Sequence, residues 1–229
     1  MTGLMEVDTD DGTWMVPPYS GVWLPAGERH RVRMNGVSTR SLYIEPIAAP
    51  RPSSGCEVLV VSPLLHHLLL ASSNMPALYD ESGRDGALAQ LLLYELQLSA
   101  SLPLFAPLPQ DPELAGLCRD FLAQPHIRSL PEEWAKQLHR SQRTFNRLFR
   151  QQTGLSFAVW RQQACLMAAV PRLLAGSSVT RTALELGYDS PGAFSSMFRK
   201  ALGQSPTAFV RAATRQGEEL PNHGSQTEA

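Results

Sequence analysis

The second half of the chain repeats one pattern of apolar and polar positions. The apolar positions are Phe145, Leu148 and Phe149 in the first copy and Phe194, Met197 and Phe198 in the second, 49 residues later. The i, i+3, i+4 spacing places each set on one buried face of a helix. Ser141 and Ser190 precede these helices as candidate N-caps, and Gly154 and Gly203 follow them as candidate C-terminal stops. The pattern therefore predicts two matched helices of about three turns.

A shorter helix is predicted before each of these. Ser129 and Glu132 have the spacing of a capping box at the start of the first short helix. The second begins near Val179 and ends at Gly187. Each copy thus predicts a helix-turn-helix unit, over residues 129–154 and 177–206. One such unit is also typical of an α-helical bundle, but two matched copies favour a pair of probes for successive DNA major grooves, about 34 Å apart.

A longer helix is predicted between the two units. It runs from about residue 157 to 175, with Ser156 as its N-cap and Gly176 as its stop. Pro171 lies inside it and removes the hydrogen bond to residue 167. This predicts either a kink that resets the angle between the units or a bend that packing accommodates. The apolar pattern continues at Leu173 and Leu174, which favours the bend.

Residues 113–211 resemble the DNA-binding domain of the AraC/XylS family of bacterial transcription regulators. The run ALELGYDSPGAFSSMFRKALGQSPTAF, residues 183–209, is similar to that family's C-terminal signature, and WRQQACLMAA, residues 160–169, resembles the helix that joins its two reading units. The resemblance implies seven helices, binding to specific double-stranded promoter DNA and no enzymatic activity. RNA polymerase is a further candidate partner. Cys165 stands where the family commonly has an arginine.

The resemblance also implies which side chains contact DNA. The family's base-reading positions match Arg143, Asn146 and Arg147, and arginine suits guanine whereas asparagine suits adenine. In the second unit the matching positions hold Pro191, Gly192, Ser195 and Ser196, so we expect little direct base reading there. The candidate base-reading residues are Gln142, Arg143, Asn146, Arg147, Ser195 and Ser196, and the candidate backbone contacts are Arg140, Ser141, Arg150, Ser190, Arg199 and Lys200.

The charge distribution agrees with this interpretation. The 229 residues carry a net charge of −1, but residues 113–212 hold thirteen Lys/Arg against six Asp/Glu, a net of +7. Residues 1–112 have a net charge of −6 and the tail from residue 213 a net charge of −2. A basic block on the helical repeat is what a phosphate-binding module needs. A protein that coats DNA without sequence preference, or a generic solvated helical surface, is compatible with the same charge.

The front of the chain predicts short strands, so the fold class is α+β. Residues 4–45 contain two hairpin-turn signals, at Asp10-Asp11-Gly12 and at Asn35-Gly36. Residues 12–36 resemble the second half of a cupin, the small β-roll that serves as sensor in many AraC/XylS members. A whole roll needs earlier strands, so we expect either an internal start at Met1 or a shortened sensor. The predicted divisions are a partial cupin-like sensor and dimerisation domain (1–100), a Pro-rich linker (101–112), the DNA-binding domain (113–215) and a disordered tail (216–229).

Five side chains of the sensor region are candidates for an apolar effector pocket or for ordinary β-roll core. They are Trp14, Tyr19, Trp23, His30 and Tyr43. The rival function is a ligand- or metal-binding cupin with an incidental helical domain. It would require several metal ligands, whereas His30 is the only histidine among the predicted strands. We therefore expect no metal and no cofactor.

The segment between strands and linker predicts one more strand, residues 57–61, and helices over 63–71 and 86–100. Leu88, Leu91, Leu92 and Leu96 form an apolar stripe on the second of these helices. That stripe either forms a homodimer contact or packs within its own chain. The chain's three cysteines are widely spaced, which suits inert thiols in a reducing cytoplasm, although redox sensing by Cys165 stays open. The run LLHHLLL, residues 64–70, is too short to span a membrane.

Overall fold

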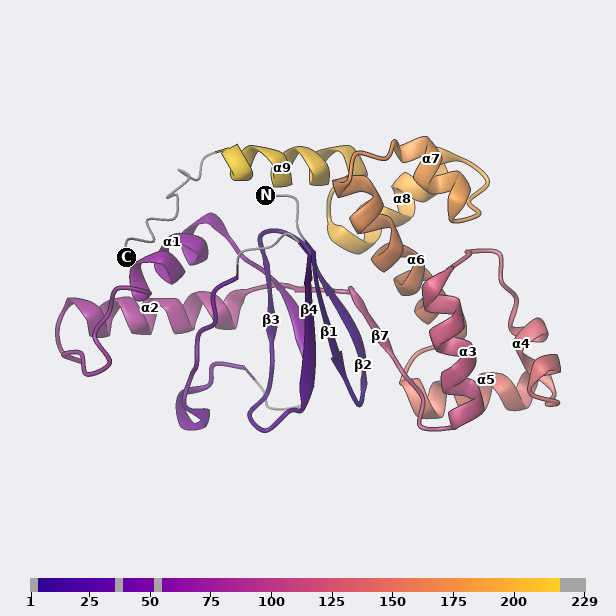
Figure 1. Ribbon diagram of the computed structural model, residues 1–229, viewed down its shortest axis with the longest axis horizontal. Helices are drawn as coiled ribbons and strands as arrows, with labels where there is room; N and C mark the ends of the chain where they lie inside the picture. Colours follow the sequence, from indigo (N-terminus) through magenta and orange to yellow (C-terminus); the bar gives the residue numbers. More distant parts are fainter. Residues whose placement is uncertain (1–3, 36–38, 52–54, 219–229) are drawn as a thin grey trace, which may run out of the picture.

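The computed structural model describes residues 4–35, 39–51 and 55–218. A part with two small antiparallel sheets and two helices is followed by an all-helical part, and strand β7 leads from one to the other (Figure 1). The predicted α+β class is confirmed. The helical part carries the predicted repeat, so the sheets matter here mainly for how they hold it.

The strands form two antiparallel sheets. The first contains β1 (Leu4–Thr9), β2 (Gly12–Val16), β4 (His30–Asn35) and β7 (Phe105–Pro107), in the order β4-β1-β2-β7. The second contains β3 (Ser20–Trp23), β5 (Glu57–Val60) and β6 (Ser101–Leu102), in the order β3-β5-β6. The predicted turn at Asp10-Asp11-Gly12 joins β1 and β2, where Thr9 pairs with Gly12. The predicted turn at Asn35-Gly36 runs into residues 36–38, outside the described residues.

The predicted Pro-rich linker, residues 101–112, contains paired strand in its first half. Strands β6 and β7 lie in this segment and pair with β5 and β2, and Leu104 and Ala106 are fully buried. Proline is tolerated here because β7 is an edge strand, where a missing N–H leaves no gap in the ladder. Gly12 is required opposite it, since a Cβ there would lie 2.6 Å from the carbonyl oxygen of Ala106. The helical part is thus attached to the first sheet through β7, which pairs with β2.

Two helices, α1 (Pro63–Ser72) and α2 (Arg84–Leu98), pack against each other beside the sheets. They lie within two residues of the predicted spans. Arg51 fixes the end of α2, because its Nη1 donates to the carbonyl oxygens of Leu96 and Ser99, each at 2.9 Å. The other nitrogen of the fork, Nη2, pairs with Glu57 of β5 at 2.6 Å. The hydrogen bond from Ser101 and the Arg51 charge lower the pKa of Glu57.

The helical part contains the seven helices that the family resemblance implies, within the described residues. They are α3 (Pro112–Ala123), α4 (Pro131–Gln137), α5 (Gln142–Thr153), α6 (Phe157–Leu174), α7 (Val179–Glu185), α8 (Pro191–Leu202) and α9 (Pro206–Glu218). The long helix α6 runs between α3–α5 on one side and α7–α9 on the other (Figure 1). It continues through Pro171 and buries Leu173. The Arg172 side chain donates to the carbonyl oxygen of Ala168 at 2.8 Å, next to the Met167 carbonyl whose main-chain donor Pro171 removes.

Two local predictions need correction. The first short helix starts one residue later than expected: Leu130 is the N-cap, and the carboxylate of Glu133 accepts from its N–H at 3.0 Å. Pro131 suits the first helical position and moves the start there, while Ser129 accepts from the Trp134 indole N–H at 3.0 Å. The expected disordered tail, residues 216–229, begins inside α9, which reaches Glu218. Its remainder, residues 219–229, lies outside the described residues.

Candidate nucleic-acid interface

The first helix-turn-helix unit consists of α4, a turn and α5. The hydroxyl of Ser141 accepts from the N–H of Thr144 at 3.2 Å and starts α5, as predicted. Phe145 and Phe149 are fully buried, and their rings lie 6.2 and 6.4 Å from the ring of Trp134. The same two rings lie 5.5 and 5.4 Å from Phe157 at the start of α6. This aromatic cluster fixes which face of α5 points to solvent.

The solvent face of α5 carries the predicted base-reading residues. Gln142, Arg143, Asn146, Arg147 and Arg150 are all exposed. Among residues 4–35, 39–51 and 55–218, none of the three arginines on this face makes an ion pair, so their guanidinium groups are available to an external anion or base. Gln142 differs, because its amide donates to Glu132 at 2.7 Å. The predicted backbone contact Arg140 also has an internal partner, since its Nη2 lies 3.8 Å from the Asp111 carboxylate.

The second unit repeats this construction with α7, a turn and α8. The hydroxyl of Ser190 accepts from the N–H of Ala193 at 3.1 Å, and Pro191 occupies the first helical position. Phe194 and Phe198 are fully buried, and their rings lie 5.3 Å from Tyr188 and 5.5 Å from Phe209, respectively. Gly154 and Gly203, which end α5 and α8, have nearly equal left-handed φ angles of 72° and 75°. The predicted N-caps and terminal glycines of α5 and α8 are confirmed.

The solvent face of α8 differs in chemistry from that of α5. Its first turns present Gly192, Ala193 and Ser196 to solvent, while Ser195 is half-buried. Two exposed cations, Arg199 and Lys200, follow in the last turn. Neither makes an ion pair within the part of the chain that the structure describes. The exposed side chains of α8 are therefore short at the start of the helix and basic at its end.

Comparison with known proteins identifies the chain. A family model described as a helix-turn-helix domain matches residues 134–212. The HTH-type transcriptional regulator NimR of Escherichia coli K12 is 33% identical over 213 residues, which are 93% of this chain and 78% of NimR. The chain belongs to the AraC/XylS family of bacterial transcription regulators.

Two solved structures are also similar to this AraC/XylS-family chain. The DNA-binding domain of AdpA, a global transcriptional factor crystallised with a target DNA, is 31% identical; the match covers 48% of this chain and all of that domain, with a TM-score of 0.44. ToxT from Vibrio cholerae is 8% identical; the match covers 91% of this chain and 89% of ToxT, with a TM-score of 0.42.

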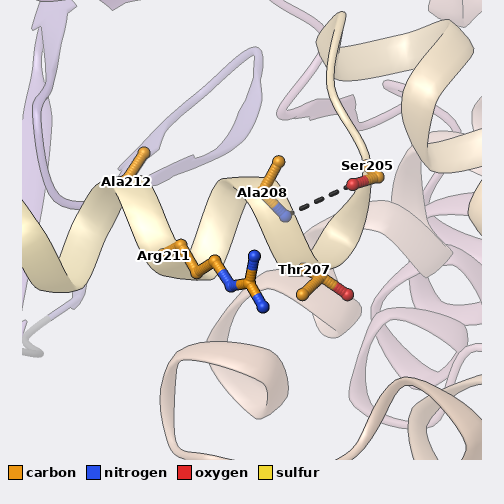
Figure 2. A pocket seen from close by; sticks show the side chains of 5 residues that line it. All are labelled: Ser205, Thr207, Ala208, Arg211 and Ala212. Atoms are coloured by element: carbon orange, nitrogen blue, oxygen red, sulfur yellow. Dashed lines mark hydrogen bonds between the residues drawn. The ribbon is translucent and has the colours of Figure 1, made fainter.

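Sequence reasoning missed an exposed cation close to the second helix-turn-helix unit of this AraC/XylS regulator. Arg211 projects from α9 beside a shallow hollow (Figure 2). The hollow is lined by Ser205, Thr207, Ala208, Arg211 and Ala212. Ser205 accepts from the N–H of Ala208 at 3.3 Å and so caps the helix. Arg211 belongs to the basic block of residues 113–212, but its spacing in the sequence does not distinguish it from a cation on an ordinary solvated helix face.

The structure does not bring together the five residues expected at an effector pocket. Trp14 is buried, stacks on Phe105 with ring centroids 4.1 Å apart, and donates to the Cys56 carbonyl oxygen at 3.1 Å. By contrast, the side chain of Tyr43 is 93% exposed, because it lies in an irregular segment after β4. His30 is exposed as well, whereas Tyr19 and Trp23 are half-buried. A cavity beside Trp14 contains none of the other four.

That cavity lies between the sheet and the end of α5. Its lining residues are Asp11, Trp14, Gly55, Cys56, Phe105, Pro107, Leu108, Gln110, Gln152 and Thr153. The two parts of the chain also meet through hydrogen bonds: the Trp160 indole N–H donates to the Pro107 carbonyl oxygen at 2.8 Å, and the Asp111 N–H donates to the Gln152 side chain at 2.9 Å. The sheet therefore contacts α6 through β7, and the start of α3 contacts the end of α5.

Other side-chain chemistry in the described residues of this AraC/XylS regulator is sparse. Cys56, Cys118 and Cys165 are buried free thiols, and burial raises the pKa of each to about 12. Such thiols carry little thiolate at neutral pH and react slowly. No cluster of three or more His, Cys, Asp or Glu that could hold a metal occurs among the described residues. Within the same residues, no helix is both long and apolar enough to cross a bilayer.

Proposed function

We propose that this regulator binds promoter DNA by placing α5 and α8 in two successive major grooves of one duplex face. The observation that carries the proposal is the matched construction of the two helices, which share caps and buried aromatic positions and each carry exposed cations. Helix-turn-helix units dock a second helix of this kind in the major groove, with half-sites one helical turn apart. The basic block on residues 113–212 supplies attraction to phosphates.

We assign most of the base reading to α5. The free guanidinium groups of Arg143 and Arg147 suit guanine, and the Asn146 amide suits adenine. Gln142 has to leave Glu132 before it can reach a base. On α8, Ser195 and Ser196 are short, so base reading there is minor and the sequence preference of this half comes largely from DNA shape. The residues proposed for backbone contacts are Arg140, Ser141 and Arg150 in the first unit and Ser190, Arg199 and Lys200 in the second.

We propose residues 1–100 as a sensor and dimerisation domain and residues 113–215 as the DNA-binding domain. The side chains of Leu91, Tyr94 and Leu98 on α2 are 42%, 56% and 79% exposed, which supports a homodimer contact along that helix. The cavity beside Trp14 supports a small-molecule effector, because a ligand there would touch both the sheet and α5. A regulator bound at a promoter lies close enough to contact RNA polymerase. Three buried thiols suit the reducing cytoplasm, and we assign the chain no catalytic role.

Competition gel shifts test the DNA-binding proposal. Labelled fragments of the source genome are incubated with the protein and an excess of bulk DNA, at several salt concentrations. We expect at least one fragment to resist competition, with an affinity that falls steeply as salt rises because phosphate contacts release counterions. Equal displacement of all fragments would instead show a protein that coats DNA without preference. Absence of any salt-sensitive binding would favour a ligand-binding cupin.

Sedimentation equilibrium tests the dimer. Leu98→Glu places a charge on the most exposed apolar side chain of α2 without disturbing buried Leu92. We expect the wild-type chain to dimerise and this variant to be monomeric. Leu184→Glu, on the similarly exposed apolar side chain of α7, serves as the matched control and should leave the dimer intact.

A further inference from the structure

A short segment directly before the first reader unit (α4, a turn and α5) touches the second reader unit (α7, a turn and α8). Residues 125–129 connect α3 to α4, and in Figure 1 this connection lies on the side of α3 and α4 that faces α7 and α8. The N–H of Ile127 donates to the carbonyl oxygen of Leu186 at 2.8 Å. Leu186 is fully buried and ends α7. The segment before α4 is therefore joined by a main-chain hydrogen bond to the turn that precedes α8.

The next residue of that turn is packed against the same segment. Gly187 has a left-handed φ of 78°, which glycine adopts without strain. The His126 ring lies directly against it, so that a Cβ at position 187 would be 2.2 Å from both Cε1 and Nε2 of the imidazole. The ring is held in turn by the N–H of Arg128, which donates to Nδ1 at 3.3 Å. Only glycine permits this approach.

Two more contacts extend the connection. The guanidinium of Arg128 pairs with the carboxylate of Asp189, the residue directly before the N-cap Ser190 of α8. The guanidinium of Arg161 on α6 donates to the carbonyl oxygen of Ser129. Residues 125–129 are thus tied both to the helix that joins the two units and to the turn that positions α8.

We propose that residues 125–129 form a brace that sets the distance and rotation between α5 and α8, and that the brace thereby selects the half-site spacing which the protein accepts. This inference rests on the proposed function. The covalent connection between the units is α6 with a short turn at each end, and α7 and α9 also pack against α6. The brace adds contacts at Leu186, Gly187 and Asp189, directly before α8, and so resists rotation of α8 relative to α5. One inserted base pair moves a half-site about 3.4 Å along the duplex and about 34° around it, so a rigid pair of readers cannot follow.

The test uses duplexes of graded spacing. A preferred site is selected from a random-sequence duplex library with the full chain and footprinted, and one or two base pairs are then inserted between the two protected segments. We expect wild-type affinity to fall on the order of tenfold with the first insertion, as the second reader loses its contacts. Arg128→Gln and Asp189→Asn should each flatten this profile, with a loss of about threefold or less on insertion.

The two substitutions distinguish a loss of the brace from a simple change in charge next to the DNA. Without a brace, Arg128→Gln removes a cation and weakens binding to every duplex, whereas Asp189→Asn removes an anion and strengthens it, with the spacing profile unchanged in both. That outcome would overturn the proposal. The exchanged pair Arg128→Asp with Asp189→Arg should restore the steep profile. Arg181→Gln breaks an exposed ion pair inside α7, at 2.7 Å from Glu185, and is the matched control that should keep the wild-type profile.

Gly187→Ala gives the largest perturbation, because it displaces the His126 ring and strains the turn. The thermal unfolding midpoint of Gly187→Ala is measured as well, to check that this variant is folded. The variants at exposed Arg128 and Asp189 test the spacing profile without backbone strain. A wild-type chain that selects no preferred site overturns the proposed function and the brace with it. A wild-type chain that binds a preferred site but tolerates insertions, or variants that keep its steep profile, overturn the brace alone.

Discussion

The two reader units of this regulator are alike on the inside and different on the outside. Positions 145 and 149 of α5 and positions 194 and 198 of α8 are all phenylalanines with no exposed surface. The outer positions, at the same offset, exchange Asn146 and Arg147 for Ser195 and Ser196. Buried positions fix where each helix lies, and exposed positions fix what it can bind. The comparison shows that the same buried scaffold can carry long polar side chains on one helix and short ones at the matching positions of the other.

The units also differ in how they are supported. The first packs its phenylalanines into a cluster with Trp134, Phe157 and Trp160, and Trp160 is bonded to the sheet through the Pro107 carbonyl oxygen. The second has a smaller cluster with Tyr188 and Phe209 and contacts the first through residues 125–129. The unit proposed to read bases is therefore the one that lies beside the sheet, because the cavity at Trp14 is lined by both the sheet and the end of α5.

The largest effects should come from breaking the shared interior. We expect Phe149→Ala and Phe198→Ala each to lower the free energy of unfolding by about 3–5 kcal/mol, because each leaves a cavity that surrounding helices cannot fill. Urea unfolding followed by circular dichroism measures both. Leu184→Ala, at a side chain that is 62% exposed, is the control and should change stability by less than about 0.5 kcal/mol. A small effect at either phenylalanine would show that the two interiors are not equivalent.

Substitutions on the exposed faces should give the next largest effects, and these should differ between the two units. We expect Arg147→Ala to cost about 1–3 kcal/mol of binding free energy on the preferred site and to relax the sequence preference at one base position. Ser196→Ala, the matching change on α8, should cost less than about 0.5 kcal/mol, because a serine at this position has little reach. Dissociation constants on the preferred site and on single-base variants measure both. Equal losses of binding free energy for the two variants would contradict the assignment of most base reading to α5.

Much of the helical part could be predicted because its signals are local. Ser141, Ser190, Gly154 and Gly203 act on neighbouring residues, so their positions in the sequence were enough to place helix ends within a residue or two. The buried stripes follow from spacing alone. The sequence predicts the start of α4 one residue too early, because Pro131 competes with Ser129 as a start signal.

The rest depends on contacts between distant residues. Nothing near Phe105 or Pro107 shows that they pair with β2, so the sequence predicts only a Pro-rich linker there. The contact of His126 with Gly187 joins residues far apart in the chain, and no periodicity marks it. The aromatic residues expected at a pocket were grouped by type, whereas the fold buries Trp14 and leaves Tyr43 in solvent. Among the DNA contacts, the sequence showed residue type and helix face but not that Arg140 and Gln142 have partners within the chain.

The helix caps should give equal and smaller effects in the two units. In each, the serine hydroxyl accepts from the N–H three residues later, at 3.2 Å for Ser141 and 3.1 Å for Ser190. We expect Ser141→Ala and Ser190→Ala each to destabilise the fold by about 1 kcal/mol, since each leaves one N–H without an acceptor. Urea midpoints measure the loss, and Ser141→Asp and Ser190→Asp should retain most of the stability. A clear difference between the two alanine variants would mean that α5 and α8 do not depend equally on their caps.

The smallest expected effect concerns the basic end of α8. Lys200 is exposed and makes no ion pair among the described residues, so a phosphate is its natural partner. We expect Lys200→Ala to lower the slope of log affinity against log salt by about one and to weaken preferred and scrambled duplexes by the same factor. The reverse change, Ser196→Arg, should raise the slope by about one if that position faces the duplex. A sequence-dependent loss at Lys200 would instead place base reading on α8, and the contrast between the two readers would then be one of degree.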